Sequence, residues 1–378
     1  MRMLVLGAGL QGTACAYDLL NNPAVERVLL ADVRVAELPP FLSSLASPRL
    51  QQLALDVRDA AAVRAAFAQC DAVMSAIPYY LNFALAELAV EAGVHFCDLG
   101  GNTAIVDQQK TLDAAAKANG VSVVPDTGLA PGMVNIVAQH AIDQFDHVES
   151  VQLFVGGLPQ APLPPLNYQI AYSIEGMIDY YTTPSMVLRE GKPQEMSALS
   201  ELETVHFDAP LGALEAFHTA GGLSTMGARY AGRIAHMEYK TLRYPGHARI
   251  MESIRGLGLL SLEPVNVKGQ TVVPRDLFVQ VAGDKLRQGK PDLVALRVVV
   301  TGTRGGTRST RTWEVVDFYD ATHGISAMMR TTGYTLSITG QLQASGSVSP
   351  GVHTPDECIP ATQYFAMLAT RGVQVRER

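Results

Sequence analysis

Short apolar runs alternate with longer segments of helical periodicity from the first residues to Pro125. The apolar runs predict six strands, at residues 3–6, 28–31, 52–55, 72–76, 95–98 and 121–124. Helices are predicted between them, for example at 59–69, where Asp59 can cap a run of good helix formers, and at 81–92. Strands that alternate with helices are typical of a parallel sheet built from βα units. This part of the chain therefore predicts a doubly wound domain.

The pattern changes after Gly128, where proline-rich sequence and strand-like alternation take over. Residues 149–154 and 168–172 alternate as half-buried strands do. Residues 293–301 and 310–318 are rich in β-branched side chains and are joined through residues 304–307, which predicts a hairpin. From Ser326 onward the pattern is helical again, and we expect these helices to pack back on the first domain.

The length of 378 residues exceeds what a single core usually supports, which favours two domains. The predicted fold class is α/β, with a Rossmann doubly wound parallel sheet at residues 1–127. It is followed at 128–325 by an α+β domain for substrate binding and dimerisation, with a mainly antiparallel sheet. Residues 326–378 are predicted to be C-terminal helices that return to the Rossmann domain.

Composition narrows the class of protein. The chain is 48% hydrophobic and 17% charged, and no segment approaches the roughly 20 apolar residues of a membrane-spanning helix. Its opening apolar run leads straight into a glycine motif, unlike a signal peptide. The net charge of −7 comes without a basic block, which argues against nucleic acid or an anionic membrane as partner and favours a small molecule.

The cysteines lie far apart, with no CxxC pair, so neither a zinc site nor a disulfide framework is predicted. They are Cys15, Cys70, Cys97 and Cys358. This spacing fits a reducing cytoplasm. There is no His, Cys and Asp cluster with the spacing of metal ligands, and hydride transfer needs no metal, so we predict no metal site.

A glycine motif follows the first predicted strand. Gly7, Gly9 and Gly12 form G-x-G-x-x-G, and with Leu10 and Gln11 they are predicted to bind a dinucleotide pyrophosphate at the start of a helix. Asp32 lies about twenty residues further on, where a carboxylate accepts hydrogen bonds from the adenosine ribose. The alternative is a tight turn beside an ordinary surface Asp.

The cofactor prediction extends to other strand ends. A carboxylate at Asp32 would repel a 2′-phosphate, which favours NAD over NADP, although Arg34 weakens that inference. The third predicted strand is followed by residues where adenine commonly packs, and the fourth by residues near the nicotinamide ribose, or both are simply sheet ends and turns. These residues are Asp56, Val57, Ala76, Ile77 and Pro78.

Several segments resemble the saccharopine dehydrogenase family over nearly the whole chain. They are D-x-G-x-x-P-G-x-x-N from Asp126 to Asn135, CDLGG at 97–101, VGGLP at 155–159, EAF at 215–217, GLST at 222–225 and KTLRYPGH at 240–247. The resemblance implies a Rossmann domain, a substrate domain, a homodimer, and terminal pieces at 351–352 and 355–357 packed on the cofactor domain. Gly100 and Gly128, within two of these segments, join the predicted cofactor-binding residues.

Within that family, residues 164–173 and 240–247 look most like the lysine 6-dehydrogenases. That resemblance implies NAD-dependent oxidative deamination of the ε-amino group of lysine. The semialdehyde formed would cyclise to a piperideine carboxylate, and ammonia would be released.

Such a reaction needs a group that accepts the amine proton. We place Asp126, at the carboxyl end of the sixth predicted strand, beside the substrate amine; alternatively it caps the next helix or braces the turn at Gly128. Lys240 and Arg243 lie in a basic stretch, and one of them is expected to hold the substrate carboxylate. Lys240 could instead be the base, or the stretch could be a solvated strand.

His218 and His247 lie near glycine-containing turns and could exchange protons near neutral pH, although single histidines are more often structural. Tyr168 and Tyr172 alternate onto one face of a predicted strand, where their phenols could line the substrate pocket or simply pack in the core. Thr225 is a further candidate for substrate binding.

Two other functions fit the same residues. One is a saccharopine-type reductase acting on a secondary amine of a larger amino-acid conjugate, with Arg189, Arg229 and Arg233 as additional anchors for carboxylates. The other is a non-catalytic NAD-binding sensor that has kept the fold and lost the chemistry. The three functions differ in their products: the lysine dehydrogenase would form NADH and release ammonia, the saccharopine-type enzyme would release an amino acid in place of ammonia, and the sensor would form no NADH.

Overall fold

The computed structural model describes residues 1–35, 37–170 and 174–378, which form two compact units. The first unit comprises Met1–Gln144, Ser224–Met226 and Tyr319–Arg376, and the second comprises Phe145–Leu223, Gly227–Phe318 and Glu377–Arg378. The first unit extends beyond the predicted boundary at residue 127. The reason is that helix α7 (Met133–Ile142) packs on α13 (Pro355–Cys358), α14 (Ala361–Ala369) and α12 (Ala327–Ala344), all of the same unit.

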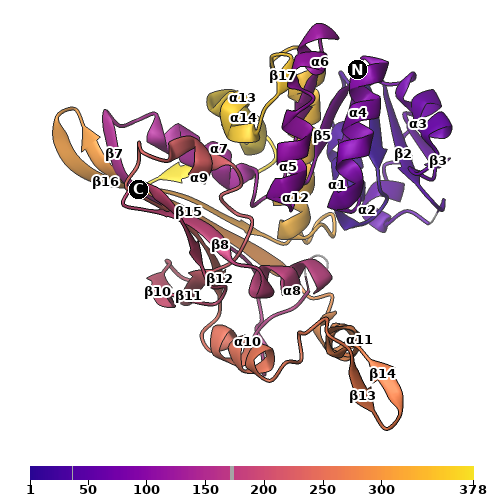
Figure 1. The fold of residues 1–378 in the computed structure, drawn as a ribbon. Coiled ribbons are helices and arrows are strands. Elements are labelled where there is room, and N and C mark those ends of the chain that lie inside the picture. The colour runs from indigo at the N-terminus through magenta and orange to yellow at the C-terminus, as the bar shows by residue number, and fades with distance from the viewer. Residues whose placement is uncertain (36, 171–173) are drawn as a thin grey trace. The chain divides into compact units, whose positions relative to one another are not determined.

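The first unit is built on a seven-stranded parallel sheet in the order β17-β6-β5-β4-β1-β2-β3 (Figure 1). The six predicted strands are confirmed, and the two-residue strand β17, which the pattern did not predict, adds a seventh beside β6. The strands are β1 (Arg2–Leu6), β2 (Arg27–Asp32), β3 (Leu50–Ala54), β4 (Ala72–Ser75), β5 (His95–Asp98), β6 (Ser122–Val124) and β17 (Gly351–Val352). Met3 to Leu6 in β1 are buried on both sides, as a central parallel strand covered by helices should be.

Helices cover both faces of this sheet. One face packs on α3 (Ala60–Phe67), α4 (Asn82–Ala92) and α6 (Asp113–Ala118), and the other on α1 (Leu10–Leu20) and α12. As predicted, the Asp59 carboxylate caps α3, accepting from the backbone N–H groups of Ala61 and Ala62. Shorter helices are α2 (Pro40–Ser43), η1 (Tyr79–Leu81) and α5 (Thr103–Lys110).

The C-terminal helices return to the cofactor domain, as predicted. Helix α12 lies along α1, where the missing side chain of Gly333 gives room to Ala14. The hydroxyl of Ser337 donates to the buried carboxylate of Asp18 at 2.6 Å, and Arg371 pairs with the same carboxylate at 2.5 Å. The tail is therefore tied to the unit by a buried polar contact as well as by apolar packing.

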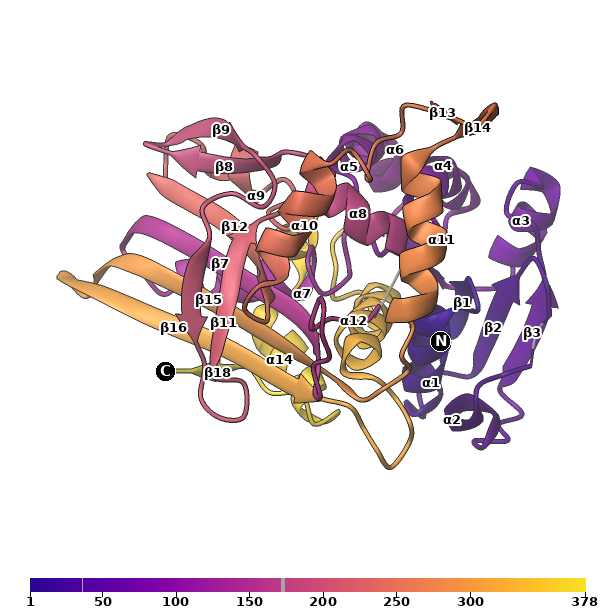
Figure 2. The same ribbon diagram turned by 90° about the horizontal axis from the view of Figure 1, so that it is seen from below.

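The second unit is organised around a nine-stranded, mostly antiparallel sheet (Figure 2). Its strands follow the order β10-β11-β12-β7-β15-β16-β18, with β8 and β9 attached beside β12, and β12 runs parallel to β7. They are β7 (His147–Pro159), β8 (Ser185–Arg189), β9 (Lys192–Met196), β10 (Glu203–His206), β11 (Ala213–His218), β12 (His236–Arg243), β15 (Asp292–Arg304), β16 (Thr307–Phe318) and β18 (Arg376–Glu377).

The predicted hairpin is confirmed as β15 and β16, which pair from Leu293 opposite Phe318 to Arg304 opposite Thr307. Its turn is Gly305-Gly306, and both glycines have positive φ values, which a tight two-residue hairpin turn requires. The hairpin is longer than predicted because the polar residues at its tip also pair.

Two hydrophobic clusters cover opposite faces of the second sheet. One joins Phe217 of β11 to α8 (Ile174–Thr182), α10 (His247–Gly256) and α11 (Pro274–Leu286), and the other surrounds Leu214 and Leu242. A separate hairpin, β13 (Val265–Val267) and β14 (Gln270–Val272), precedes α11, and α9 (Met226–Tyr230) begins at the last residue of the segment that belongs to the first unit.

One predicted strand is wrong. Residues 168–170 form no strand, since they follow a proline pair and Asn167, whose φ of 49° interrupts extended backbone, and they pack as a loop in the first of these clusters. Within the described ranges, no helix is both long and apolar enough to cross a membrane.

Candidate functional site

The glycine motif forms the turn from β1 into α1. A Cβ on Gly12 would lie 1.8 Å from the carbonyl oxygen of Gly7, so only glycine lets the helix approach the strand. Gly7 has a φ of 94°, and its Cβ would lie 2.7 Å from the carbonyl oxygen of Ala76. Gly9, the N-cap of α1, has no protein atom within 4 Å of its Cβ position. The space in front of Gly9 fits the close approach of a pyrophosphate to a helix N-terminus.

The first turn of α1 contains no acidic residue, so the helix itself adds no negative charge at its N-terminus. Leu10 is 58% exposed, while the side-chain carbonyl of Gln11 is buried and has no hydrogen-bond partner in the described part of the chain. An acceptor without a protein partner at this position fits a bound group that donates to it.

Asp32, the last residue of β2, lies beside the glycine turn. Its Oδ2 accepts a hydrogen bond of 2.7 Å from the backbone N–H of Ala8. That bond joins the ends of the first two strands and fixes the carboxylate where the ribose of a dinucleotide is recognised.

The other predicted cofactor residues also follow strand ends at this edge. Asp56 follows β3 and forms an exposed ion pair of 2.7 Å with Arg58, which lowers the pKa of Asp56 to about 2. Ala76, Ile77 and Pro78 follow β4, and the first two contact the position of Gly7. Val57, between Asp56 and Arg58, is half-buried. The carboxyl ends of β1 to β4 thus present the edge at which open α/β sheets bind ligands.

Asp126 lies just beyond β6 and is 2% exposed. Its φ of 63° is left-handed, which is uncommon for a residue other than glycine. Gly100, with a φ of 69°, makes room for it, because a Cβ there would lie 1.8 Å from Asp126 Oδ1. Gly128 and Gly132 shape the turn that follows, with the Cβ position of Gly132 only 2.2 Å from the carbonyl oxygen of Gly128. The glycines of the D-x-G-x-x-P-G motif therefore fold the turn that holds the Asp126 carboxyl.

The electrostatics of Asp126 set it apart from an ordinary surface carboxylate. Burial raises its pKa to about 7, and the neighbouring Asp98 carboxylate adds to the rise, while the Ser224 hydroxyl and the backbone N–H of Gly101 act in the opposite direction. Burial likewise raises the pKa of Asp98 to about 6. Oδ1 of Asp126 is buried and accepts no hydrogen bond of ordinary geometry from the described residues. A carboxyl group in this state can take up or release a proton near neutral pH.

Ser224 was not predicted as a site residue. Its hydroxyl donates a short hydrogen bond to Oδ2 of Asp126, and its own φ is 49°. The segment Ser224–Met226 belongs to the first unit although the residues around it belong to the second. Thr225, predicted to bind substrate, is buried with its hydroxyl 3.4 Å from that of Thr354. Ser224, rather than Thr225, is the hydroxyl beside the candidate base.

Arg243 is the centre of a buried polar chain in the second unit. Its Nε donates to the Tyr181 hydroxyl at 3.1 Å, and that hydroxyl lies 2.9 Å from Nε2 of His247. Nδ1 of His247 lies 3.0 Å from the carbonyl oxygen of Leu166, which can only accept. His247 therefore carries its proton on Nδ1, accepts from Tyr181 on Nε2, and holds that phenol toward Arg243.

The predicted proton exchange at His247 near neutral pH is wrong. Burial and the positive charge of Arg243 lower its pKa to about 3, so the ring stays neutral and serves as a fixed hydrogen-bonding group. Tyr168 packs edge-on to the same imidazole, and the Arg243 guanidinium lies 4.7 Å from the centre of the Tyr168 ring. The prediction for Tyr172 falls outside the described residues.

Lys240 and His218 lie on the opposite face of the sheet from Arg243. They are paired across β11 and β12, and side chains along a strand alternate, so Lys240 and Arg243, three residues apart, point to opposite sides. Both are buried, which excludes the solvated strand considered as an alternative. The Lys240 ammonium donates to Glu203 at 2.6 Å and to the carbonyl of Glu201 at 3.0 Å. Lys240 and His218 therefore belong to one polar cluster and Arg243 and His247 to another.

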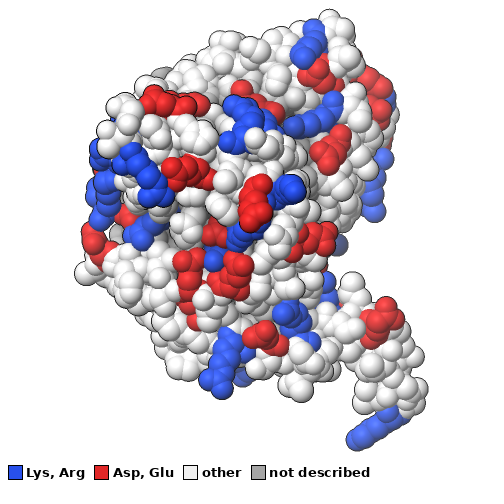
Figure 3. Space-filling view, turned by 60° about the vertical axis from the view of Figure 1, so that its left-hand side comes forward, with Lys and Arg blue, Asp and Glu red and all other residues white. Residues whose placement is uncertain are grey.

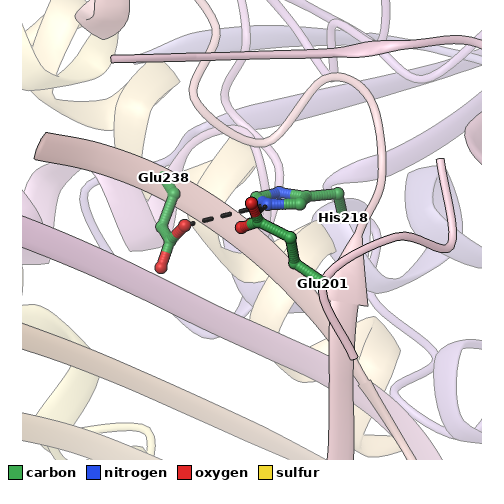
Figure 4. Close-up of side chains that lie close together, drawn as sticks. All are labelled: Glu201, His218 and Glu238. Atoms are coloured by element: carbon green, nitrogen blue, oxygen red, sulfur yellow. Dashed lines mark hydrogen bonds and ion pairs between the residues drawn. The ribbon is translucent and has the colours of Figure 1, made fainter. Parts of the chain in front are cut away.

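Figure 4 shows the centre of the cluster that contains Lys240 and His218, where two carboxylates lie near the same nitrogen of the His218 ring. Nε2 of His218 is 2.9 Å from Glu201 and 3.8 Å from Glu238. Their oxygens could in principle hold a metal ion with His218, but a single Nη2 of Arg189 bridges both, at 2.8 and 2.6 Å. Burial tends to raise the pKa of Glu238, yet the hydrogen bond from Gln152 and the nearby cations outweigh it and the pKa is lowered. Protein cations thus compensate these carboxylates, and we assign the cluster as an ion-pair network.

On the face drawn in Figure 3, basic and acidic side chains are interspersed, with no area of a single sign. That distribution differs from the basic stripe of a nucleic-acid-binding surface.

Two family models together match almost the whole chain. The saccharopine dehydrogenase NADP binding domain matches residues 3–124, and the saccharopine dehydrogenase C-terminal domain matches residues 128–373. The chain belongs to the saccharopine dehydrogenase family. The resemblance drawn from the motifs is thereby confirmed.

Individual relatives of the family align over their full length. Saccharopine dehydrogenase (NADP(+), L-glutamate-forming) of Schizosaccharomyces pombe is 22% identical, covering 99% of this chain and 98% of its own. Carboxyaminopropylagmatine dehydrogenase of Synechocystis sp. is 22% identical, covering 100% and 97%. The apo saccharopine dehydrogenase (L-Glu forming) from Saccharomyces cerevisiae superposes with a TM-score of 0.81 at 20% identity, covering 100% and 99%, which confirms the fold.

The saccharopine dehydrogenase family supplies the class of chemistry. Its members here are amino-acid dehydrogenases that act at carbon–nitrogen bonds, and this chain is an enzyme of that kind. The nucleotide-binding domain is present, and the family model names it for NADP. The sequence did not single out Ser224 or Tyr181. Ser224 lies within the family-like segment at 222–225 and Tyr181 lies in a helix without a motif, and only the fold brings them to the candidate groups.

Proposed function

We propose that this chain is an NAD-dependent dehydrogenase that oxidatively deaminates the ε-amino group of L-lysine. The bound nicotinamide would supply hydride acceptance. The C–H bond beside the amine breaks, the amine loses a proton to the protein, and water hydrolyses the resulting imine to the semialdehyde with release of ammonia. The semialdehyde then cyclises to a piperideine carboxylate.

The observation that carries the proposal is the state of Asp126. A base must be unprotonated at the working pH and still attract a proton, which requires a pKa near that pH. Burial provides this by raising the pKa of Asp126 to about 7, and Oδ1 is the oxygen that accepts no ordinary hydrogen bond from the residues that the structure describes. We assign the proton acceptor to Asp126 and a positioning role to Ser224, which holds Oδ2.

Arg243 is our candidate for holding the substrate carboxylate. A planar guanidinium matches a carboxylate with two parallel hydrogen bonds. Its Nε is fixed by Tyr181, which His247 holds in turn, so the orientation of the group is set before substrate arrives. Arg243→Lys should therefore raise KM for an α-amino acid by about 10-fold or more while changing kcat less.

NAD is preferred over NADP in this proposal because of Asp32. A carboxylate fixed by Ala8 at this position accepts from ribose hydroxyls and repels a 2′-phosphate. Asp32→Ser should weaken NAD binding and narrow the difference in Kd between NAD and NADP, measured by fluorescence titration. If the variant binds NAD as tightly as the wild type, Asp32 does not bind the ribose. If the wild type prefers NADP, we would assign Arg34 as the residue that binds the 2′-phosphate.

A second candidate is a dehydrogenase of secondary amines that joins or splits a larger amino-acid conjugate. It is supported by the names of the full-length relatives, which are dehydrogenases of saccharopine and of carboxyaminopropylagmatine. Both substrates carry a C–N–C linkage where lysine has a terminal amine. The same base and cofactor geometry would serve, and the nitrogen product would be an amine or amino acid instead of ammonia.

The deciding experiment measures NADH and NADPH formation at alkaline pH with lysine, ornithine, saccharopine and carboxyaminopropylagmatine. Lysine turnover with one ammonia per NADH supports the first candidate, and turnover only of a conjugate supports the second. Asp126→Asn, which keeps the shape of the side chain, should lower kcat at least 100-fold on whichever substrate is active. NAD binding without turnover of any of these substrates would instead support the third function, a non-catalytic NAD-binding sensor.

A further inference from the structure

A second buried carboxylate, Asp98, lies in the first unit beside the candidate base. It is the last residue of β5, belongs to the segment CDLGG at 97–101, and is 1% exposed. A carboxylate this deeply buried is uncommon unless its oxygens are paired or hydrogen-bonded, because burial penalises the charge. The contacts of Asp98 therefore indicate what holds it there and what it does.

The Asp98 side chain accepts hydrogen bonds from neutral groups. The backbone N–H of Gly100 donates to Oδ1 at 2.7 Å, and the side-chain amide of Gln109 donates to Oδ2 at 2.7 Å. The side-chain amide of Asn82 and the backbone N–H of Asp126 also donate to this carboxylate. These four neutral donors fix the group and leave its negative charge in place.

Asp98 also holds the turn that carries Asp126. The backbone N–H of Thr127 donates to the carbonyl oxygen of Asp98 at 2.7 Å, and the Thr127 hydroxyl donates to the same oxygen at 2.8 Å. With the bond from the N–H of Asp126, Asp98 accepts from two consecutive residues of the turn. A residue other than glycine keeps a φ of 63° only where its surroundings hold it. Asp98 supplies part of that hold.

The two carboxyl groups flank the same glycine. The N–H of Gly100 binds Oδ1 of Asp98, while a Cβ on Gly100 would lie 1.8 Å from Oδ1 of Asp126. A negative charge on Asp98 therefore acts on Asp126 at short range within a buried site, where charges interact more strongly than in water.

Other groups act on Asp126 as well. Asp356 of α13 is a third buried carboxylate and raises the pKa of Asp126, but less than Asp98 does. The Ser224 hydroxyl and the N–H of Gly101 favour the charged form. Of the charges that face the candidate base, Asp98 thus has the largest effect.

We propose that Asp98 is a positioning residue for the candidate base, which clamps the left-handed turn at Asp126 and places a second negative charge beside its carboxyl group. Like charges at short range oppose each other's ionisation, so the loss of one proton makes the other harder to remove. Asp98 thereby strengthens Asp126 as a base, and it needs no contact with the substrate to do so. This inference rests on the proposed role of Asp126 as proton acceptor.

The test variant, Asp98→Asn, removes the charge and keeps the shape of the side chain. Its carbonyl oxygen can still accept from Gly100. Its amide also finds an acceptor, because Oε1 of Gln109 is buried without a hydrogen-bond partner among the described residues and can exchange places with Nε2 by rotation of the Gln109 amide. The variant therefore isolates the effect of the charge.

The first measurement follows the titration of Asp126 in the protein without ligand, so it needs no substrate. The gain in Tm on Asp126→Asn should grow from about pH 4 and level off near pH 7, because burial raises the pKa of Asp126 to about 7. In the Asp98→Asn background, the gain should level off on the order of one pH unit lower and at a smaller final value. A gain that levels off at the same pH in both backgrounds overturns the proposal.

The second measurement is the pH profile of kcat/KM on whichever substrate is active. Its acidic limb should move to lower pH in Asp98→Asn by the same interval, whereas a merely structural defect would lower kcat/KM equally at every pH. A loss as large as that of Asp126→Asn without any shift would identify Asp98 as the base and overturn the proposal. If the titration of Asp126 shifts but no substrate reacts, the proposed function fails while the inference on Asp98 is supported.

Glu91→Gln is the matched control. Glu91 lies near the end of α4, just before β5 begins, and forms an exposed ion pair of 2.7 Å with Arg64. The control removes one negative charge at the opposite end of β5 from Asp98 and should change neither measurement. An equal shift in the control would assign the effect to net charge and overturn the proposal.

A third measurement covers the case in which Asp98→Asn does not fold. The interaction between the two carboxyl groups is mutual, so removing the charge of Asp126 must also make Asp98 ionise more readily. The carboxyl ¹³C resonance of Asp98 should therefore titrate at lower pH in Asp126→Asn than in the wild type. Equal midpoints in the two proteins would show that the groups do not interact, and the proposal would be wrong.

Discussion

Replacing Asp126 by asparagine should make the first unit more stable at alkaline pH and leave its stability almost unchanged at pH 4. Asparagine keeps the shape of the protonated side chain, can accept from Ser224, and tolerates the left-handed φ of 63° at this position better than most residues. It removes only the ability to ionise. The variant therefore isolates the free energy that the buried carboxyl costs the fold once it is charged.

The sign follows from the raised pKa. Folding raises the pKa of Asp126 from its ordinary value of 3.8 to about 7, chiefly by burial. Its contribution to stability is fully present below pH 4, where folded and unfolded chains both hold the proton, and is lost as the pH rises through 7. A difference of about three pKa units corresponds to about 4 kcal/mol above pH 8. Asp126→Asn should recover roughly 2–4 kcal/mol of this.

The assay is thermal unfolding of wild type and variant without ligand at pH 4, 6, 7, 8 and 9, with the difference taken at each pH so that other groups cancel. For a unit of about 200 residues, the gain at pH 9 should raise Tm by roughly 5–15 °C, with half of the change between pH 5 and 7. A difference that is constant across pH would refute the raised pKa of Asp126, and with it the reason for choosing this residue as the base.

Ser224→Ala should move the acidic limb of the kcat/KM profile to higher pH, since the Ser224 hydroxyl lowers the pKa of Asp126.

Three further outcomes test other parts of the structure. Gly12→Ala should abolish NAD binding and destabilise the first unit by about 1–3 kcal/mol in urea unfolding, since its Cβ would lie 1.8 Å from the Gly7 carbonyl oxygen. His247→Phe should reduce the loss of stability of the second unit on acidification from pH 6.5 to 4, because the pKa of the histidine is lowered to about 3 and its stabilisation is present above pH 6.5 and lost as the pH falls. Glu238→Gln should cost about 1–3 kcal/mol in the same unfolding assay by weakening the pair with Arg189, and added divalent cation should not restore it.

The first unit was predictable because its signals are local. Each strand is a short apolar run, each helix has its own period or cap, and the glycines stand at fixed distances from the first strand. Strand β17 was not predicted, because two residues are too few to show the alternation of a strand. Its place beside β6 also depends on the C-terminal tail folding back. The first compact unit continues past residue 127 to Gln144, because α7 packs on helices from the end of the chain, a contact that no local pattern records.

In the second unit, the sequence contained information about side-chain direction that the prediction did not use. Lys240 and Arg243 are three residues apart in a strand, and the alternation of side chains alone places them on opposite faces. By contrast, Tyr181 lies in a helix with no motif, and Ser224 lies in a loop whose return to the first unit is a tertiary event. The roles of these two depend on distances that no sequence spacing implies.

The two polar clusters of the second sheet differ in what they leave for a ligand. Around His218, each carboxylate already meets a guanidinium or an ammonium, and a further ion would have to displace Arg189 from two hydrogen bonds. Around Arg243, Nε donates to a neutral phenol and Nη1 to a backbone carbonyl, and these contacts orient the guanidinium. Glu215, which pairs with Arg243 across β11 and β12, is buried, and its carboxylate accepts from the backbone N–H groups of Gly246 and Ala248. The fixed orientation of Arg243, more than the presence of basic residues, is why we propose anion recognition on its face of the sheet and a structural role on the face of Lys240.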